Sequence, residues 1–462
     1  MGDVEAATDF NPHCVLPSME PSSGGPMAEQ DGPLDELAES LEKKEEEEKS
    51  LRFMLSVYFS FRGGALRLLS VSFLSAIGGG MSWFVLILYI YVLFPNLTNV
   101  TVIFSVSSWV SAFLFFPGGM LVDRFEHRRV LAFSILLGAS AMVVFAISQV
   151  LWMIILGQAL NGMMQSINRP VVQAMMTEKI SDRRRKYLFS MQSVVAMIGV
   201  AIASSMAGVW TIAAQNWFDM DLETAYRYMF LAAAVANVVA MFVALTIRSG
   251  EEGRESKAEK LPSLVDDDVD DDEARRRGLK FIVKFSVPMM MIGFGAGFVV
   301  PFFQLYYFVK FDVEISEIAW LFAATQLAMA LSFLLIPNLA ERKGTPRAIV
   351  ATQGFAVVNL AIIPFAPTFY IAAPFHLMRM SLMNASTPIQ GSLMMGAVRP
   401  VDRGKAAAIG AIMWTVTNSL SQTLAGWVMD TYGLDAPFII AITFYSSAVF
   451  LFWYWFRNVG EM

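Results

Sequence analysis

The 462-residue sequence has a single cysteine and only three histidines. One cysteine excludes a disulfide framework and any cysteine-based zinc site, and three histidines leave little for a histidine metal cluster. Charged residues make up 16% of the chain, against about 25% in soluble domains. The chain has no Walker motif for direct use of ATP, and a net charge of −6 gives no support for nucleic-acid binding. We therefore predict no cofactor, no metal and no nucleic-acid partner.

Apolar residues dominate the composition instead. Hydrophobic side chains make up 56% of the sequence, and the mean hydropathy is +0.52, which is typical of a membrane protein. Beyond residue 66 the apolar runs are about 20 residues or longer, enough to cross roughly 30 Å of hydrocarbon as helices. We predict an all-α membrane protein with twelve transmembrane helices, at about 68–94, 99–122, 130–149, 151–177, 187–213, 226–247, 281–309, 315–338, 347–366, 368–396, 404–430 and 436–456.

Polar segments divide these spans into two sets of six. Residues 1–66 are predicted to form a disordered, acidic cytoplasmic tail with an amphipathic interfacial helix over 51–66. Residues 248–280 are charged and punctuated by Pro and Gly, which predicts a cytoplasmic linker. The sequence thus predicts an N-terminal six-helix bundle at 67–247 and a C-terminal six-helix bundle at 281–457.

Basic residues are distributed unevenly between the two ends of the predicted helices. Of 34 Lys and Arg residues, Arg169 and Arg379 lie inside spans. Arg227 and Lys310 lie on the side of the loop between the first and second spans, and all the others lie on the opposite side with both termini and the linker. The positive-inside rule therefore predicts a multi-pass protein of the plasma membrane with both termini in the cytoplasm.

The two halves repeat one another at a constant offset of 218 residues. This shift places Asp123-Arg124 on Glu341-Arg342, Arg129 on Arg347, Pro170 on Pro388, Tyr89 on Tyr307 and Ala207-Gly208 on Ala425-Gly426. A duplication of six helices with the same orientation in both copies predicts two pseudo-symmetric bundles, related by an axis along the membrane normal.

A short motif follows the second predicted span. Residues 119–129 contain Gly119, Asp123, Arg124, Arg128 and Arg129, and this spacing resembles the G-x-x-x-D-R-x-G-x-R-R signature of the major facilitator superfamily. A degenerate twin with Glu341, Arg342 and Arg347 follows the eighth span. The resemblance covers about 67–457 and implies a secondary transporter that works by alternating access.

The resemblance also implies a role for these loops. Asp123, Arg124 and Arg129 would form a conformational latch, with Glu178 or Asp182 after the fourth span as partners. Such charged groups at tight turns can pair with neighbouring helix ends and hold one packing of the two halves. The alternative is that the basic residues of both loops only set the topology.

The sequence departs from the family pattern at three points. Glu126 stands where the signature has its second glycine, so the turn must form without a residue that adopts positive φ freely. The fourth span reads Gln158-Ala-Leu-Asn161-Gly162 where the family often carries R-x-x-Q-G, a motif linked to proton coupling, and the arginine is missing. The stretch from Gly199 to Gly208 lacks the Gly-Pro motif of many drug–proton exchangers. These departures weaken the case for proton-driven drug efflux.

Polar side chains inside a span are costly, so they are candidates for a substrate cavity. Gln158, Asn161, Gln165 and Arg169 share one face of the fourth span, while His376, Arg379 and Asn384 lie on the tenth span, its equivalent under the repeat. The first, seventh, eighth and eleventh spans add Tyr89, Gln304, Tyr307, Gln326 and Asn418.

The sign of the charges inside the spans is informative. No Asp or Glu lies in the middle third of any predicted span. Arg169 and Arg379 could therefore act as counter-ions for an anionic substrate, or each could bond helix carbonyls or extend to water. His376 is the only span residue that titrates near neutral pH, so it could carry a coupling proton or be a structural, hydrogen-bonded histidine.

These features predict a monomeric secondary transporter for a small organic solute, with an organic anion as one candidate substrate. Two alternatives stay open, namely multidrug-type efflux of lipophilic compounds and a non-transporting sensor on the same scaffold. An enzyme would need a nucleophile–base pair or metal ligands inside the spans. A lone histidine, no membrane cysteine and no paired carboxylates argue against an enzyme.

Overall fold

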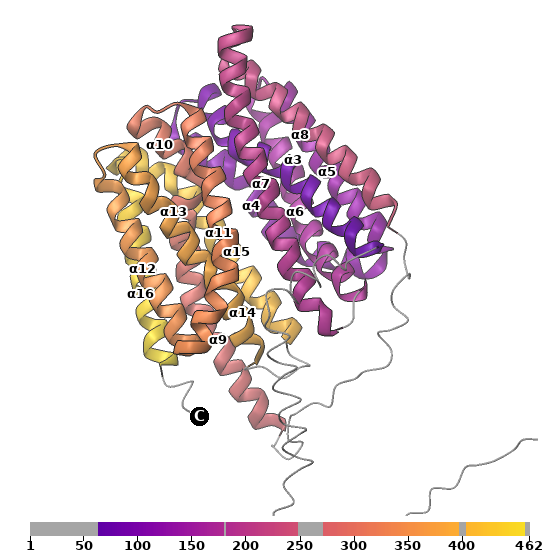
Figure 1. Ribbon diagram of the computed structural model, residues 1–462, viewed down its shortest axis with the longest axis vertical. Coiled ribbons are helices and arrows are strands. Elements are labelled where there is room, and N and C mark those ends of the chain that lie inside the picture. Colours follow the sequence, from indigo (N-terminus) through magenta and orange to yellow (C-terminus); the bar gives the residue numbers. More distant parts are fainter. Residues whose placement is uncertain (1–62, 180–181, 248–270, 397–402, 458–462) are drawn as a thin grey trace, which may run out of the picture. The chain divides into compact units, whose positions relative to one another are not determined.

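The computed structural model describes residues 63–179, 182–247, 271–396 and 403–457, all of which belong to one compact unit, Tyr58–Met462. Every regular element within these ranges is a helix (Figure 1). The predicted acidic tail with its interfacial helix, and most of the predicted linker, lie outside the described residues.

Six continuous helices make up the N-terminal bundle. They are α3 (Gly64–Leu93), α4 (Leu97–Arg124), α5 (His127–Ile147), α6 (Leu151–Lys179), α7 (Asp182–Phe218) and α8 (Leu222–Leu245).

The C-terminal bundle also has six spans, three of which are interrupted. Helix α9 (Asp271–Val299) continues through η1 (Val300–Phe302) into α10 (Phe303–Phe311), α12 (Thr345–Ile362) ends in η2 (Ile363–Phe365), and α13 (Phe369–Ala385) is followed by α14 (Thr387–Gly396). Helices α11 (Ile315–Lys343), α15 (Arg403–Tyr432) and α16 (Ala436–Phe456) are continuous. Two of the breaks fall at Pro301 and just before Pro388, because proline has no backbone N–H to donate to the preceding turn.

Two segments differ most from the prediction. Helix α9 begins at Asp271, so residues 271–280 of the predicted linker are helical; their Ala, Arg and Glu residues are good helix formers. The tenth span, predicted as one helix over 368–396, is divided at Ser386.

Nine helical stretches of the described residues are long and apolar enough to cross a membrane. The three other spans are α6, α13 with α14, and α15, which carry most of the polar residues that the sequence places inside the bilayer. Together they give the twelve predicted transmembrane helices.

Helix packing repeats between the two halves. In the N-terminal bundle α3 packs on α7 and α8, α4 packs on α6, and α5 packs on α6 and α8. In the C-terminal bundle α9 packs on α15 and α16, α11 packs on α13, and α12 packs on α13 and α16. The bundles meet through two equivalent seams, α4 with α15 and α7 with α11. The 218-residue repeat of the sequence is therefore also a repeat of the structure.

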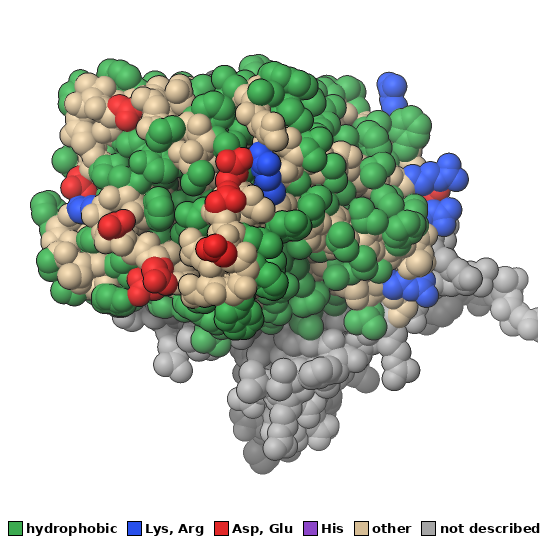
Figure 2. Space-filling view, turned by 90° about the horizontal axis from the view of Figure 1, so that it is seen from above, with side chains coloured by type: hydrophobic (Ala, Val, Ile, Leu, Met, Phe, Trp, Pro, Cys, Tyr) green, Lys and Arg blue, Asp and Glu red, His purple; other side chains and the backbone are tan. Residues whose placement is uncertain are grey.

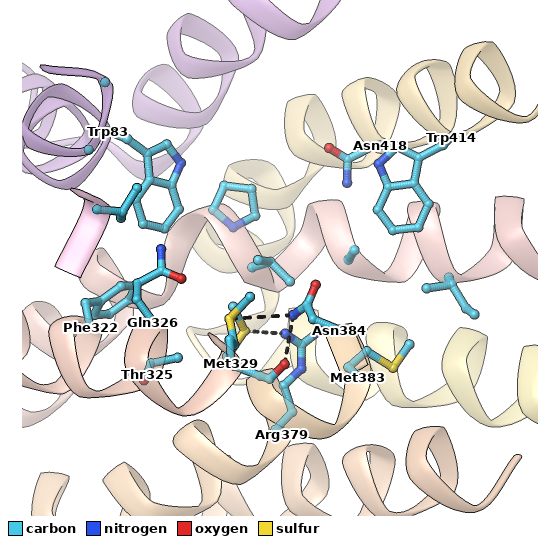
Figure 3. A pocket seen from close by; sticks show the side chains of 18 of the residues that line it. Trp83, Phe322, Thr325, Gln326, Met329, Arg379, Met383, Asn384, Trp414 and Asn418 are labelled. Atoms are coloured by element: carbon cyan, nitrogen blue, oxygen red, sulfur yellow. Dashed lines mark hydrogen bonds between the residues drawn. The ribbon is translucent and has the colours of Figure 1, made fainter. Parts of the chain in front are cut away.

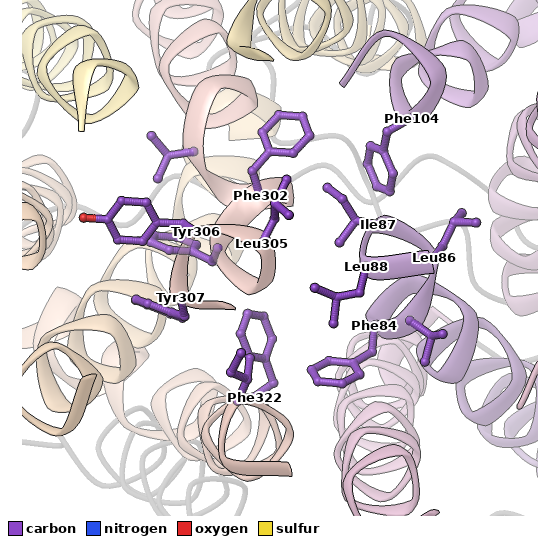
Figure 4. Close-up of a cluster of buried hydrophobic side chains, with 14 of the residues drawn as sticks. Phe84, Leu86, Ile87, Leu88, Phe104, Phe302, Leu305, Tyr306, Tyr307 and Phe322 are labelled. Carbon is purple, nitrogen blue, oxygen red and sulfur yellow. The ribbon is translucent and has the colours of Figure 1, made fainter. Parts of the chain in front are cut away.

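A plug of buried aromatic and aliphatic side chains joins the bundles (Figure 4). The ring centroids of Phe84 on α3 and Phe322 on α11 are 5.8 Å apart. Those of Phe104 on α4 and Phe302 in η1 are 5.9 Å apart. The 218-residue shift places Phe84 on Phe302 and Phe104 on Phe322, so these two contacts are copies of each other. We call these four residues the aromatic clasp.

The α4–α15 seam is also held by hydrogen bonds between side chains of the two bundles. Asp430, at the end of α15, accepts bonds from the backbone N–H and the hydroxyl of Thr98, at 2.8 and 2.6 Å. Nearer the middle of the helices, the Trp109 indole donates to the Thr423 hydroxyl at 2.9 Å. These contacts and the aromatic clasp lie towards the end that holds the α3–α4 loop, and they close the space between the bundles on that side.

Two basic residues of the described ranges lie at this end, and both are paired. Arg227 contacts Glu223 at 2.6 Å and donates to the carbonyl of Ser148, just after α5. Lys310 contacts Asp435 at 2.6 Å and donates to the carbonyl of Pro364, in η2. Both cations thus bind a carbonyl at a helix C-terminus, where positive charge is favoured. Figure 2 looks onto this end and shows acidic side chains gathered over its left half.

Candidate functional site

A cavity of about 500 Å³ lies between the two bundles (Figure 3). Its wall includes residues of α3 up to Trp83 and residues of the α9–η1 segment up to Pro301. Trp83 directly precedes Phe84, and Pro301 directly precedes Phe302. The aromatic clasp therefore borders the cavity on the side of the α3–α4 loop. The volume falls within the range of about 300–1,000 Å³ that small-molecule sites occupy.

Arg379 on α13 is the single charged residue among those described that lines this cavity. Its side chain is 2% exposed. One terminal nitrogen donates to the hydroxyl of Tyr445 at 2.6 Å and the other to the sulfur of Met380 at 2.7 Å. The guanidinium also lies over the rings of Phe303 and Tyr445, at 5.7 and 5.5 Å.

The charge of Arg379 has no ionic partner among the described residues, none of whose carboxylates lies within 4.0 Å of it. The Nε–H of Arg379 is buried and likewise has no acceptor among the described residues. Tyr445 and Met380 hold the guanidinium in place but do not neutralise it. A buried donor and a buried charge that lack partners are costly in free energy.

Three amide side chains also line the cavity. Asn418 on α15 donates to the carbonyl of Gly293 at 3.0 Å, and Asn384 on α13 donates to the carbonyl of Met380 at 2.8 Å. Gln326 on α11 is half-buried. These groups can orient a polar substituent of a ligand. Trp83, Phe322 and Trp414 supply an aromatic wall, and Met329 and Met383 also line the cavity.

The polar groups of the cavity are distributed unequally between the bundles. Gln326, Arg379, Asn384, Asn418 and Tyr445 all belong to the C-terminal bundle, whereas the N-terminal bundle contributes Ala76, Gly79, Gly80, Trp83 and Val200. Under the repeat, Arg379 corresponds to Asn161 and Asn418 corresponds to Val200. Recognition of a polar ligand therefore falls to the C-terminal bundle.

The structure brings together four of the twelve predicted cavity residues, namely Gln326, Arg379, Asn384 and Asn418. The other eight do not line this cavity. Tyr89, Gln158, Gln304 and Tyr307 are buried within the bundles, Asn161 and Gln165 are half-buried on α6, Arg169 is exposed on the same helix, and His376 is buried on α13.

His376 is enclosed by aromatic rings. Its Nδ1 lies 3.0 Å from the hydroxyl of Tyr307, and its ring centroid lies 4.5 Å from that of Phe303 and 5.1 Å from that of Phe322. The side chain is fully buried, and its Nε2 has no partner in the described part of the chain. This packing favours the structural role over the coupling proton, because a coupling site must exchange protons with water.

The cavity residues that the sequence analysis missed include four aromatic ones, Trp83, Phe322, Trp414 and Tyr445. They lie in apolar stretches, where nothing in the composition separates a cavity wall from a lipid-facing surface. The repeat offers one signal, because it places Tyr445 on Arg227. Each of these residues is one member of a tyrosine–arginine hydrogen bond, since Arg379 donates to Tyr445 and Arg227 donates to Tyr89.

The loop after α4 contains two ion pairs of its own. Glu126 contacts both Arg128 and Arg129, at 2.5 and 2.9 Å. Its φ is −59°, whereas Gly344, the equivalent residue in the other half, has a φ of +83°. The loop thus forms without positive φ, and the residue that replaces the signature glycine holds its basic cluster.

Other members of the predicted latch have varied environments. Asp123, Arg124 and Arg347 are exposed, and Gly119 is half-buried. The side chains of Glu178, Asp182, Glu341 and Arg342 lie outside the described residues, so the predicted pairs with Glu178 or Asp182 stay a prediction.

Twelve membrane helices in two related bundles around a central cavity define the fold of a solute transporter. The chain belongs to the Major Facilitator Superfamily, whose family model matches residues 68–287 and 285–461.

Solved structures agree with this fold. A bacterial homologue of the human lysosomal transporter Spinster, in an inward-facing and unoccupied conformation, has a TM-score of 0.69 at 13% identity, covering 88% of this chain and 98% of that one. The nucleoside transporter NupG has a TM-score of 0.63 at 16% identity, covering 86% of this chain and 99% of that one. At these identities the likeness establishes the fold alone.

Curated relatives match over shorter stretches. Sugar phosphate exchanger 3 of Gallus gallus is 27% identical over 206 residues, which are 39% of this chain and 38% of that protein. The putative uncharacterized transporter YgaY of Escherichia coli is 35% identical over 89 residues, which are 19% of this chain and 22% of that protein. The matches thus span less than half the length of either relative.

Proposed function

We propose that this transporter moves a small organic anion across the plasma membrane by alternating access. The observation that carries the proposal is Arg379, a buried guanidinium at the cavity wall that has no carboxylate partner among the described residues. Taking a charge out of water costs several kcal/mol unless it is paired. A carboxylate or phosphate on the substrate would supply the pair, and guanidinium geometry suits both.

The rest of the wall supports an organic body for this anion. Trp83, Phe322 and Trp414 offer flat apolar surfaces, and Gln326 and Asn384 offer amide groups. This is the usual composition of a small-molecule site, in which a few polar groups orient a largely apolar ligand. The name of one partial relative, a sugar phosphate exchanger, is consistent with an anionic organic solute.

The distribution of charge indicates which end of the helices faces the outside of the cell. At the end that holds the α3–α4 loop, the basic residues among those described are Arg227 and Lys310, and both are paired with carboxylates. The positive-inside rule supports an extracellular location for this end, with both termini in the cytoplasm. With this orientation the aromatic clasp and the α4–α15 seam close the outer side, and we infer an inward-facing state.

A cationic substrate fits this cavity less well. A lipophilic cation would be brought next to the guanidinium of Arg379, and two like charges repel strongly in a medium of low dielectric constant. The multidrug-efflux alternative therefore requires a ligand that avoids Arg379.

Ligand-induced thermal stabilisation of the detergent-purified protein tests the proposal. A panel of organic monocarboxylates, sugar phosphates, lipophilic cations and neutral sugars is compared on the wild type and on Arg379→Gln. A ligand that binds only the folded state raises its apparent stability. We expect anions to stabilise the wild type, and Arg379→Gln to weaken their binding about 10- to 150-fold, the equivalent of one charged hydrogen bond.

Arg169→Gln is the matched control, because Arg169 is the other arginine inside a predicted span and does not line the cavity. We expect this variant to bind anions as the wild type does. Stabilisation by lipophilic cations alone, unchanged in Arg379→Gln, would contradict the proposal and favour multidrug efflux.

A further inference from the structure

The two seams between the bundles are equivalent by the repeat but differ in chemistry. In the α4–α15 seam, the Trp109 indole donates to Thr423, and Thr423 donates to Ser105 at 3.0 Å. The 218-residue shift places Trp109 on Leu327 and Ser105 on Ala323. Among the described residues no hydrogen bond joins α7 to α11, so this second seam lacks both the bulk and the polar contacts of the first.

A groove of about 520 Å³ lies where those side chains are missing. Its wall is formed by α7 and α11 and includes Ile202, Met206, Val209, Trp210, Ala323 and Leu327. The groove is continuous with the interface between the bundles, because Gly208 on α7 packs directly against Ala319 on α11.

The groove opens on the opposite side of α11 from the central cavity. Phe322, Gln326 and Met329 of this helix line the cavity. Leu327 lines the groove, and its neighbour one turn on, Leu331, is likewise exposed. Because these exposed apolar residues lie within a membrane-spanning stretch, the groove faces the hydrocarbon of the bilayer.

The polar groups of the groove are already satisfied by the protein. The Ser205 hydroxyl donates to the carbonyl of Ala201 at 2.9 Å, and the Trp210 indole donates to the carbonyl of Ala225 at 3.0 Å. Within the described part of the chain, no charged residue lines the groove. An occupant therefore gains apolar contact but no hydrogen bond or ion pair, which suits a hydrocarbon chain and disfavours a polar solute.

We propose that this groove binds one acyl chain of a bilayer phospholipid. This acyl chain lies in the α7–α11 seam, in the space that corresponds to that of Trp109, Thr423 and Ser105 in the α4–α15 seam. It packs against both bundles at once, so it stabilises the closed outer side that this structure shows.

Photocrosslinking of the full-length protein in nanodiscs tests this site. The probe is a phosphatidylcholine that carries a diazirine midway along one acyl chain, and labelled peptides are mapped by mass spectrometry. We expect labelling of 198–213 and 323–327 to exceed that of the exposed surface of α8 around Val235 and Val239, two residues that do not line this groove. Equal labelling of both surfaces in the wild-type protein would show only ordinary boundary lipid and would overturn the proposal.

Leu327→Trp provides the sharper comparison, because it introduces the residue that Leu327 corresponds to in the other seam. We expect it to abolish labelling of the groove, while Val235→Trp on α8 leaves that labelling intact. Labelling that persists in a folded Leu327→Trp protein would contradict the assignment. We expect anion binding at Arg379 to be unchanged in both variants. Failure of the lipid-site proposal can therefore be distinguished from failure of the proposed function.

Discussion

At the scale of single residues, the anion-binding role proposed for Arg379 carries a cost in stability. Its guanidinium is buried beside a tyrosine hydroxyl and a methionine sulfur, neither of which neutralises it. We expect Arg379→Met to raise the stability of the ligand-free protein by about 1–4 kcal/mol, because replacing buried charge by an apolar side chain is often stabilising. The same variant should lose anion binding.

Thermal unfolding of the purified variant without ligand measures this effect. It also separates the two roles considered for Arg379. If the main role of Arg379 is structural, the loss of its hydrogen bond to Tyr445 should destabilise the protein. A clear loss of stability in Arg379→Met would therefore show a structural role and not a ligand-binding one.

The two neighbouring glycines near the end of α4 give a second prediction at this scale. A Cβ on Gly118 would lie 2.7 Å from the carbonyl oxygen of Ser166 on α6, whereas a Cβ on Gly119 meets nothing within 4 Å. We expect Gly118→Ala to destabilise the protein by about 1–3 kcal/mol through overpacking. Gly119→Ala should be neutral or stabilise it by up to about 1 kcal/mol, as alanine does in a helix.

Melting temperatures of these two variants, measured side by side in the same detergent, check the prediction. Each serves as the control for the other, since the substitution and the helix are the same. A Gly119→Ala protein that is the less stable of the two would contradict the packing described for α4 and α6.

At the scale of elements, the aromatic clasp joins the bundles at the end that holds the α3–α4 loop, which is the outer end in the orientation proposed above. Phe84→Ala and Phe302→Ala each remove one of two equivalent ring contacts between α3 or η1 and the opposite bundle. Loss of a buried phenyl ring costs about 3–5 kcal/mol in a protein core. Because the clasp exists only while the outer side is closed, we expect both variants to shift the population towards an outward-open state, by similar amounts.

Distances between spin labels at Trp217→Cys and Tyr432→Cys, in a Cys14→Ser background, report this shift, since both sites are exposed at the outer end. Phe365→Ala is the control, because this phenylalanine is 83% exposed. Unchanged distance distributions in both clasp variants would rule out the clasp as the outer closure.

The elements also show what the sequence could and could not predict. The twelve spans, the duplication and the family followed from hydropathy, offset and motif, because each depends on many residues. The cavity was harder. Polarity marked His376 and Arg379 equally, but the long arginine side chain reaches the cavity wall, while the histidine ring is packed among Phe303, Tyr307 and Phe322. Which face of a helix meets the cavity depends on tertiary packing.

At the scale of the whole molecule, the two bundles are alike in helix packing and unlike in chemistry. The C-terminal bundle presents the arginine and the amides of the cavity, and the N-terminal bundle presents an apolar surface. Alternating access on this arrangement would move an apolar wall past a ligand held by the C-terminal bundle. The seams differ in the same way, one joined by hydrogen bonds and the other lined by a groove.

Transport by the purified protein tests the central claim most directly. Proteoliposomes loaded with an unlabelled organic anion from the binding panel are diluted into the labelled anion, and its accumulation by counterflow is followed. We predict accumulation by the wild type and by Arg169→Gln, and none by Arg379→Gln. Equal accumulation by the wild type and Arg379→Gln would contradict the account, as would counterflow of a lipophilic cation in place of every anion.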